Sequence, residues 1–408
     1  MIPTPNRNGR ALFTRLAKRL AWERYVARAN FRLRVWDGLL SRRTRKAFDA
    51  SCLMDRELPP VIGDDAILRD PRINPQSLFT PVFVKPSREY VYHVRHSVVM
   101  EPEHGFVIMP PRSLLFESVP LSEQIRSRKT MVYCSALPSF SQFLMARAGR
   151  LPVRRERAIA PMRFVFEPNY YHFIQDTLTR LALLDRHGVS EQVPLVISKQ
   201  IANAPFFAQV SKRGALGRRR WLVQDGFYIQ ADEAFIVRTG EGNRDHLDHL
   251  MDLMAVPAAD PARRRRIFLT RDIKKRGRGI TNMAALAPVL AEFQIETVDT
   301  DQLSFDEQIA LFNEAGLVVA VHGAGLTNIM FRRGAKLDLV EIFSPTETPL
   351  YFYILARTFG YGYTFVKGIE PDGVGTKANF AVDPQALRQV LLAKGLAQTT
   401  SNGYPPSV

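Results

Sequence analysis

The chain of 408 residues contains little cysteine and has no long apolar run. Its two cysteines, Cys52 and Cys134, stand in no spacing that is typical of a metal site, and a reducing cytosol is their simplest setting. No stretch of about 18 uninterrupted apolar residues occurs, which predicts that the chain has no transmembrane helix. The N-terminus also lacks an apolar segment ahead of a cleavage site, so no secretory signal is expected. We therefore expect a cytoplasmic protein.

Acidic residues are outnumbered, and the imbalance is greatest at the N-terminus. The chain carries 56 Lys and Arg against 40 Asp and Glu, which gives a net charge of +16. Residues 1–50 hold 13 of the cations and only three of the acids, interleaved with apolar side chains such as Trp22 and Trp36. A basic amphipathic segment of this kind can lie on an anionic membrane, here the inner face of the plasma membrane, or pack as a solvated helix on the main body. No nucleic-acid motif accompanies the charge, so no nucleic-acid partner is expected.

The chain is longer than a typical domain with a single hydrophobic core, so we expect two domains. In the second half, short apolar runs alternate with helical patterns, which is typical of a parallel, doubly wound sheet. In the first half, short apolar runs between Pro and Gly indicate strands, and a helix is expected over residues 170–187. We divide the chain into a basic amphipathic segment (residues 1–50), an α/β domain (51–243), a second α/β domain (244–365) and a C-terminal helix and tail (366–408).

A glycine-rich turn is the most informative segment of the sequence. An apolar run over residues 317–321 stops at His322-Gly323-Ala324-Gly325, and a helix-compatible stretch and a second apolar run follow. Such a turn would sit at the carboxyl end of a parallel strand and open a helix. Exposed backbone N–H groups and the positive end of the helix favour a phosphate there, and glycines let the backbone approach a ligand closely. We interpret the turn as the pyrophosphate pocket of a nucleotide-binding domain.

A basic loop follows the strand that we expect over residues 266–270. The loop begins with Arg271 and ends with Arg278. Ligands of open α/β sheets bind outside the carboxyl ends of the strands, so both arginines would point toward the same crevice as the glycine turn. A planar guanidinium grips phosphate oxygens in pairs, and a fixed cation stabilises a diphosphate as its bond breaks. The alternative is a run of solvated charges.

A histidine and a carboxylate share one face of the helix expected over residues 170–187. His172 and Asp176 stand four positions apart, which places their side chains together. A carboxylate beside an imidazole orients the ring and makes it more basic, which suits a general base. The alternative is a histidine whose hydrogen bonds are satisfied in a contact between helix and sheet.

Two further polar residues lie near the ends of strands expected in the second half. His322 could donate to a phosphate oxygen or a sugar hydroxyl, or it could be a satisfied core histidine. Glu341 stands among apolar neighbours, where it could accept from ribose or sugar hydroxyls or form a structural salt bridge.

No convincing metal site is present in the sequence. The acids and histidines between Asp245 and Asp252 match no standard ligand spacing, and neighbours on a surface helix explain them better. Asp299-Thr300-Asp301 precedes a capping box at Ser304, so a turn into the next helix is the better interpretation. We expect no metal cofactor.

Taken together, these residues resemble glycosyltransferase family 61 over residues 85–365. The histidine–glycine segment with the upstream Ser-Phe-x-x-Gln is the most specific part of the resemblance. The sequence departs from the family pattern at Met283, where the family commonly has an acid. The matching residues are Asn169-x-x-His172-x-x-x-Asp176, Arg271, Arg278-x-x-x-Asn282, Leu303-Ser304-Phe305-x-x-Gln308, Phe312, Ala315, His322-Gly323-Ala324-Gly325-Leu326-Thr327-Asn328-x-Met330-Phe331 and Glu341-Ile342.

The resemblance implies a GT-B architecture, with two Rossmann-like domains facing across a cleft. It implies transfer of a sugar from a nucleotide sugar, usually a uridine diphosphate sugar, with inversion at the anomeric carbon and without an essential metal. Bacterial members look like enzymes of capsule or surface-polysaccharide synthesis, so a glycan or a lipid-linked acceptor is expected. The C-terminal half would bind the donor and the N-terminal half the acceptor.

These inferences combine into one expected function, an inverting glycosyltransferase. His172, paired with Asp176, would deprotonate the acceptor hydroxyl, although Asp176 could itself be the base. The alternative function is a nucleotide- or polyanion-binding protein without catalysis, associated with a membrane. The residues expected to bind substrate are Asn169, Arg271, Arg278, Asn282, His322, Gly323, Ala324, Gly325, Asn328 and Glu341.

Overall fold

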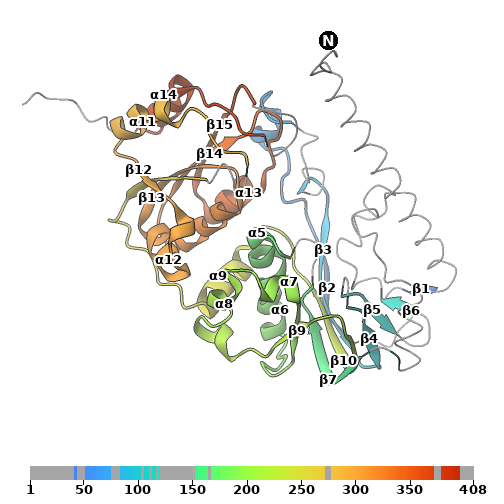
Figure 1. Cartoon of the computed structure of the whole chain (residues 1–408). Coiled ribbons are helices and arrows are strands. Elements are labelled where there is room, and N and C mark those ends of the chain that lie inside the picture. Colours follow the sequence, from blue (N-terminus) through green and yellow to red (C-terminus); the bar gives the residue numbers. More distant parts are fainter. Residues whose placement is uncertain are drawn as a thin grey trace, which may run out of the picture.

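Two β-sheets organise the chain, one in each half (Figure 1). The computed structural model describes residues 41–43, 51–74, 83–102, 105–109, 113–115, 118, 150, 152–163, 167–271, 277–371 and 378–395. The basic segment expected over residues 1–50 therefore lies outside the described residues, apart from the backbone of 41–43. Among the described helices, none combines the length and the apolar character needed to cross a membrane.

The N-terminal sheet has ten strands and mixed pairing. Its order is β1-β6-β5-β4-β10-β7-β8-β9, with β3 pairing β10 and β2 pairing β3. Strands β10, β7, β8 and β9 run parallel, whereas β3 and β4 pair β10 antiparallel. The strands are β1 (Ser41–Arg43), β2 (Ser51–Leu58), β3 (Ser87–Val94), β4 (Val98–Met100), β5 (Val107–Met109), β6 (Ser113–Leu115), β7 (Val153–Pro161), β8 (Leu195–Ser198), β9 (Trp221–Gln224) and β10 (Tyr228–Arg238).

The mixed pairing departs from the doubly wound, Rossmann-like sheet expected for this half. Short connections account for part of it: β4 ends at Met100, β5 spans Val107–Met109 and β6 begins at Ser113, which leaves no room for the helical crossovers that parallel neighbours need. Within the described residues, only the part from β7 onward alternates with helices. These helices are α5 (Tyr170–His172), η4 (Phe173–Leu178), α6 (Arg180–Arg186), α7 (Lys199–Ala202), α8 (Phe207–Val210), η5 (Gly214–Arg218) and α9 (Arg244–Leu253), and a short 3-10 turn, η2 (Ala66–Arg69), follows β2.

The C-terminal sheet is fully parallel, as the sequence predicts. Its order is β12-β11-β13-β14-β15. The strands are β11 (Arg265–Leu269), β12 (Glu296–Val298), β13 (Ala315–Val321), β14 (Asp338–Phe343) and β15 (Gly362–Lys367). The helices are α11 (Met283–Glu292), η6 (Thr300–Gln302), α12 (Phe305–Glu314), η7 (Ala324–Phe331), α13 (Tyr351–Phe359) and α14 (Pro384–Ala393).

Helices cover both faces of this sheet, which explains why its strands read as continuous apolar runs. Along β13, Leu317, Val319 and Val321 face the cluster formed with α11 and α14. Val318 and Ala320 point to the other face, which α12, η7 and α13 cover. Figure 1 shows α11 and α14 together on the outer side and α12 closer to the N-terminal half.

Several local predictions are confirmed. The capping box is present at α12, where the Ser304 side chain accepts from the Glu307 N–H and the Glu307 side chain accepts from the Ser304 N–H. Asp383 caps α14 with Pro384 in its first turn. Asp299 accepts from the Asp301 N–H and opens a short 3-10 turn, as expected of a turn-forming segment.

Two helical segments differ in type from the expectation. The helix expected over residues 170–187 contains a π-helical turn, Phe173–Leu178, between two α-helical pieces. The segment after the glycine turn is a 3-10 helix, Ala324–Phe331, closed by bonds such as Leu326 N–H to Gly323 O at 2.9 Å. This segment is buried along Leu326–Phe331, so its tertiary contacts override its helical pattern.

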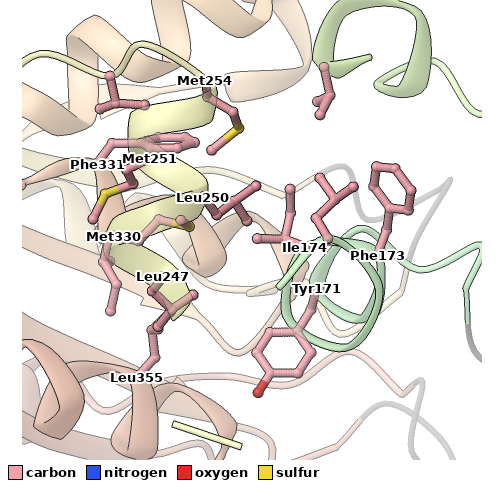
Figure 2. Close-up of a cluster of buried hydrophobic side chains, with 14 of the residues drawn as sticks. Tyr171, Phe173, Ile174, Leu247, Leu250, Met251, Met254, Met330, Phe331 and Leu355 are labelled. Carbon is pink, nitrogen blue, oxygen red and sulfur yellow. The ribbon is translucent and has the colours of Figure 1, made fainter. Parts of the chain in front are cut away.

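Helix α9 lies between the two halves, at the point where the sequence suggested a boundary. In Figure 2, Leu250 and Ile174 approach each other on one side of α9, and Met251 and Phe331 pack on the other. The burial extends over both halves in one continuous cluster. Helix α9 thus packs against both halves, and the division of the chain at residue 244 stays a prediction.

A buried polar contact also ties the halves together. The Tyr170 hydroxyl donates to Asn328 Oδ1 at 2.6 Å, and Asn328 Nδ2 donates to Gln308 Oε1 at 2.8 Å. Gln308 Nε2 in turn donates to the carbonyls of Thr300 and Leu303. Asn328 is fully buried, so each of these bonds satisfies a group that water does not reach.

We expect Tyr170→Phe to lower the free energy of unfolding by about 1–3 kcal/mol, because it leaves the buried Asn328 oxygen without its donor. Urea denaturation of Tyr170→Phe, Asn328→Ala and the double variant measures the coupling between the two residues. Strictly additive losses would contradict a direct contribution of this contact.

Candidate active site

A hollow lies at the carboxyl ends of β11 and β13, at the sheet edge where ligands of such folds bind. Its empty volume is about 430 Å³, which includes open solvent at its mouth. The glycine turn and Arg271 thus meet at one opening, as the sequence predicts. The lining residues are Leu269, Thr270, Arg271, Thr300, Asp301, Ala320, Val321, Gly323, Gly325 and Leu326.

Arg271 passes directly over the glycine turn. A Cβ atom at residue 323 would collide with Nη1 of Arg271, so the guanidinium occupies the space that a side chain would need. Gly323 has an extended backbone that any residue can adopt, so this close approach is the reason for glycine here. Arg271 Nε donates to the Gly277 carbonyl at 2.8 Å, which fixes the guanidinium at the rim of the hollow.

The other basic and amide residues expected at this site do not line the hollow. Arg278 has a left-handed backbone (φ +55°) and does not line the hollow. Burial lowers the pKa of its guanidinium, and its Nε has no hydrogen-bond partner among the described residues. Asn282 exchanges two hydrogen bonds with the Val382 backbone, at 2.8 and 3.0 Å. Ala324 is partly exposed beside the lining glycines, and Asn328 is committed to the contact with Tyr170.

His322 and Glu341 form a dyad under the turn. His322 Nδ1 lies 2.5 Å from Glu341 Oε1, and the Tyr363 hydroxyl donates to Glu341 Oε2 at 2.7 Å. The Glu341 carboxylate is fully buried and both of its oxygens are engaged. In this arrangement Glu341 orients His322 rather than reaching a sugar hydroxyl itself. Burial and the Glu341 charge hold the pKa of the Tyr363 hydroxyl well above its usual range.

His172 and Asp176 form a second dyad in the N-terminal half. His172 Nδ1 lies 2.6 Å from Asp176 Oδ2, and the two side chains are about equally shielded, at 15% and 13% exposure. Asp176 lies within the π-helical turn, a distortion that is frequent at functional sites. Asn169 caps the start of the helix by accepting from the Tyr171 N–H at 2.9 Å, so its amide oxygen serves the fold.

The electrostatic environment keeps Asp176 ionised. Burial alone would raise the pKa of Asp176, but the hydrogen bond and charge of His172 outweigh it and leave the pKa below its ordinary value. The carboxylate can therefore accept Nδ1–H of the ring, which places the lone pair of the neutral imidazole on Nε2. This is the tautomer that a general base requires.

Tyr351, at the start of α13, is a ring neighbour of both dyad histidines. Its ring centroid is 5.9 Å from that of His172 and 6.4 Å from that of His322. The dyads are far apart in the sequence, yet each places its histidine beside this one aromatic ring. Burial raises the pKa of the Tyr351 hydroxyl, which therefore stays protonated. Sequence reasoning did not find Tyr351, because it belongs to no motif and carries no distinctive spacing.

Glu241 is a second residue that sequence reasoning missed. It lies beyond the end of β10, close enough to Asp176 and Tyr171 to interact with them electrostatically. Burial, followed by the charge of Asp176, raises the pKa of Glu241 well above its usual range. The sequence did contain a signal for this residue, namely its position between Gly240 and Gly242 just after an expected strand.

The histidines and acids on α9 have protein partners. His246 is fully buried and lies 3.3 Å from Glu89, and His249 lies 2.8 Å from Asp185. The helix therefore buries one face, which carries His246, and leaves Asp245 and Asp252 exposed on the other, as expected of neighbours on a surface helix. Within the described part of the chain, no group of three or more His, Cys, Asp or Glu is arranged to hold a metal ion.

Residues 170–337 match the model of the family Glycosyltransferase 61. The resemblance inferred from the motifs is thereby confirmed at the level of the family. The matched span contains both dyad histidines and Arg271 but ends before Glu341 and Tyr351. No curated protein matches the chain.

We expect Gly323→Ala to weaken the binding of inorganic pyrophosphate about tenfold. The new methyl group would displace the Arg271 guanidinium, which would then lose a charged hydrogen bond to the pyrophosphate. Gly63→Ala is the matched control, since nothing lies within 4 Å of its Cβ and it does not line the hollow. Isothermal titration calorimetry compares the two variants. Equal affinities would contradict a phosphate role for Arg271.

Proposed function

This chain is a glycosyltransferase with a family 61 domain over residues 170–337, and we propose that it transfers a sugar from a uridine diphosphate sugar to a hydroxyl group with inversion at the anomeric carbon. The observation that carries the proposal is the placement of two kinds of group around one centre. A cationic, glycine-lined hollow lies in the C-terminal half, and the histidine of a dyad in the N-terminal half neighbours the same Tyr351 ring as His322, which directly precedes the glycine turn.

The donor diphosphate would occupy the hollow. Arg271 and the backbone of Gly323 and Gly325 line it, and together they offer a fork of guanidinium donors and a closely approachable main chain. As the bond between the anomeric carbon and the diphosphate breaks, negative charge grows on the phosphate oxygens. A fixed guanidinium stabilises that charge without reorganising, which lowers the barrier.

The acceptor would lie next to His172. Nε2 of its imidazole takes the proton of the acceptor hydroxyl as the oxygen attacks the anomeric carbon, and Asp176 stabilises the imidazolium that forms. Attack in line with the departing diphosphate requires the base and the phosphate site on opposite sides of the sugar. The placement of His172 and Arg271 in different halves supports this geometry.

His322 would contact the donor from the side of the hollow. Its partner Glu341 holds Nδ1, so Nε2 is the ring nitrogen that a ligand would meet. An N–H group at Nε2 would suit a phosphate oxygen or a sugar hydroxyl as its hydrogen-bond acceptor. Glu341, buried beneath the ring, contributes by fixing the tautomer.

The wider setting of the reaction is also part of the proposal. We take the two halves as a GT-B-like pair with the acceptor in the N-terminal and the donor in the C-terminal half. The acceptor would be a glycan or a lipid-linked glycan of a surface polysaccharide, assembled on the cytoplasmic side of the membrane. The basic segment over residues 1–50 would bring the enzyme to that anionic surface.

We expect His172→Ala to lower kcat by about 10²–10⁴-fold while the affinity for the donor changes little, because the ring serves the acceptor proton and not the phosphates. The measurement is release of free uridine diphosphate from a panel of uridine diphosphate sugars. A matched control is His93→Ala, which breaks a similar histidine–carboxylate pair with Glu233 on the N-terminal sheet. Full turnover by His172→Ala would remove the residue from the mechanism.

A further inference from the structure

We propose that the turn after β12 forms the nucleoside end of the hollow, where Asp301 accepts hydrogen bonds from the ribose hydroxyls of the donor. The proposal rests on the proposed function, because it takes a nucleotide sugar as the ligand of the hollow. Asp299-Thr300-Asp301 forms a turn, as the sequence predicts, and two of its residues, Thr300 and Asp301, also line the hollow. Neither of these two residues belongs to the motifs that resemble the family.

The strand order places the hollow at the switch point of the C-terminal sheet. The order β12-β11-β13-β14-β15 reads 2-1-3-4-5 when the strands are counted along the chain. The chain leaves β11 toward α11 on one face and leaves β13 toward η7 on the other, so the carboxyl ends of these two strands flank the crevice where such sheets bind ligands. In dinucleotide-binding folds an acid after the second strand accepts from a ribose hydroxyl. Asp301 follows β12, which is the second strand here.

The two ends of the hollow differ in charge. Arg271 and the two glycines, Gly323 and Gly325, follow β11 and β13, whereas Asp301 follows β12. A diphosphate is attracted by the guanidinium and repelled by the carboxylate, so its place is over β11 and β13. An ionised carboxylate only accepts hydrogen bonds, which suits the neutral, hydroxyl-rich ribose. A nucleoside diphosphate would therefore lie across the sheet edge with its ribose over β12 and its phosphates toward β13.

The three strand ends that would hold this ligand are direct neighbours. Leu269 of β11 pairs with Val298 of β12 on one side and with Ala320 of β13 on the other. The Thr270 N–H donates to the Val298 carbonyl at 2.9 Å, which keeps the ends of β11 and β12 together. A ligand that contacts both β12 and β13 thus passes the end of β11, where Arg271 stands.

Hydrogen bonds within the protein fix the turn that carries Asp301. Asp299 Oδ1 accepts from the Asp301 N–H at 3.0 Å. Gln308 Nε2 donates to the Thr300 and Leu303 carbonyls, both at 3.1 Å. These bonds hold the backbone of the turn, while the Asp301 side chain stays exposed. An acceptor on a fixed backbone loses less entropy when a ligand binds.

The first experiment compares ligands on the wild-type protein by isothermal titration calorimetry. The probes are uridine diphosphate, 2′,3′-dideoxyuridine diphosphate and inorganic pyrophosphate. Uridine diphosphate should bind at least tenfold more tightly than its dideoxy analogue, because the analogue lacks the two hydroxyls that donate to the carboxylate. Equal affinities for these two nucleotides would overturn the inference.

The second experiment assigns this preference to one residue. Asp301→Ala should bind uridine diphosphate about tenfold more weakly than the wild type and no longer distinguish it from the dideoxy analogue. Its affinity for pyrophosphate should not fall, since the variant removes a negative charge from the hollow. The matched control is Asp232→Ala, which removes an exposed acid of β10 outside the hollow and should keep the full preference.

The remaining outcomes separate this inference from the proposed function. Equal losses of pyrophosphate and uridine diphosphate affinity in Asp301→Ala would assign the residue to the structure of the hollow and overturn its ribose role. If the wild type bound neither uridine diphosphate nor pyrophosphate, the proposed donor site would fail and the inference with it. If the wild type bound both but ignored the ribose hydroxyls, the inference alone would fail.

Discussion

The structure depends on the burial of α9 between the two halves. Leu250 of this helix packs toward Ile174 of the N-terminal half and Met251 toward Phe331 of the C-terminal half, within one continuous apolar cluster. Because protein interiors are close-packed, such a cluster fixes the relative position of the elements that share it. The two histidine dyads belong to different sheets, so their common approach to Tyr351 follows from this packing and not from either sheet alone.

The two dyads share one construction. In each, a histidine presents Nδ1 to a carboxylate. His322 pairs with Glu341, to which Tyr363 donates directly. His172 pairs with Asp176, whose charge Arg180 of α6 also favours. A buried carboxylate is tolerable only when donors or positive charges surround it, and both sites meet that condition.

Much of the C-terminal half could be predicted from the sequence, because its strands are buried on both faces and its turns carry strong local signals. The capping box at Ser304 and the glycine turn at Gly323 were found in this way, and Arg271 meets the turn as expected. The antiparallel part of the N-terminal sheet could not be predicted, since short apolar runs do not reveal which strands pair. Tyr351 and Glu241 were not found either, because their importance arises from neighbours that are distant in the sequence.

The motif residues divide by what they contact. Asn169 caps a helix, Asn282 binds the Val382 backbone, and Asn328 joins the halves through Tyr170. Asparagine suits these tasks because its amide both donates and accepts, so one side chain can satisfy two buried backbone or side-chain groups. The residues with charge or a titratable ring, Arg271, His172 and His322, lie instead around the hollow and Tyr351. Polar residues in such a motif are therefore evidence of a site even where they touch no ligand: their hydrogen bonds hold the helix, the strand ends and the two halves in the positions from which the charged groups can act.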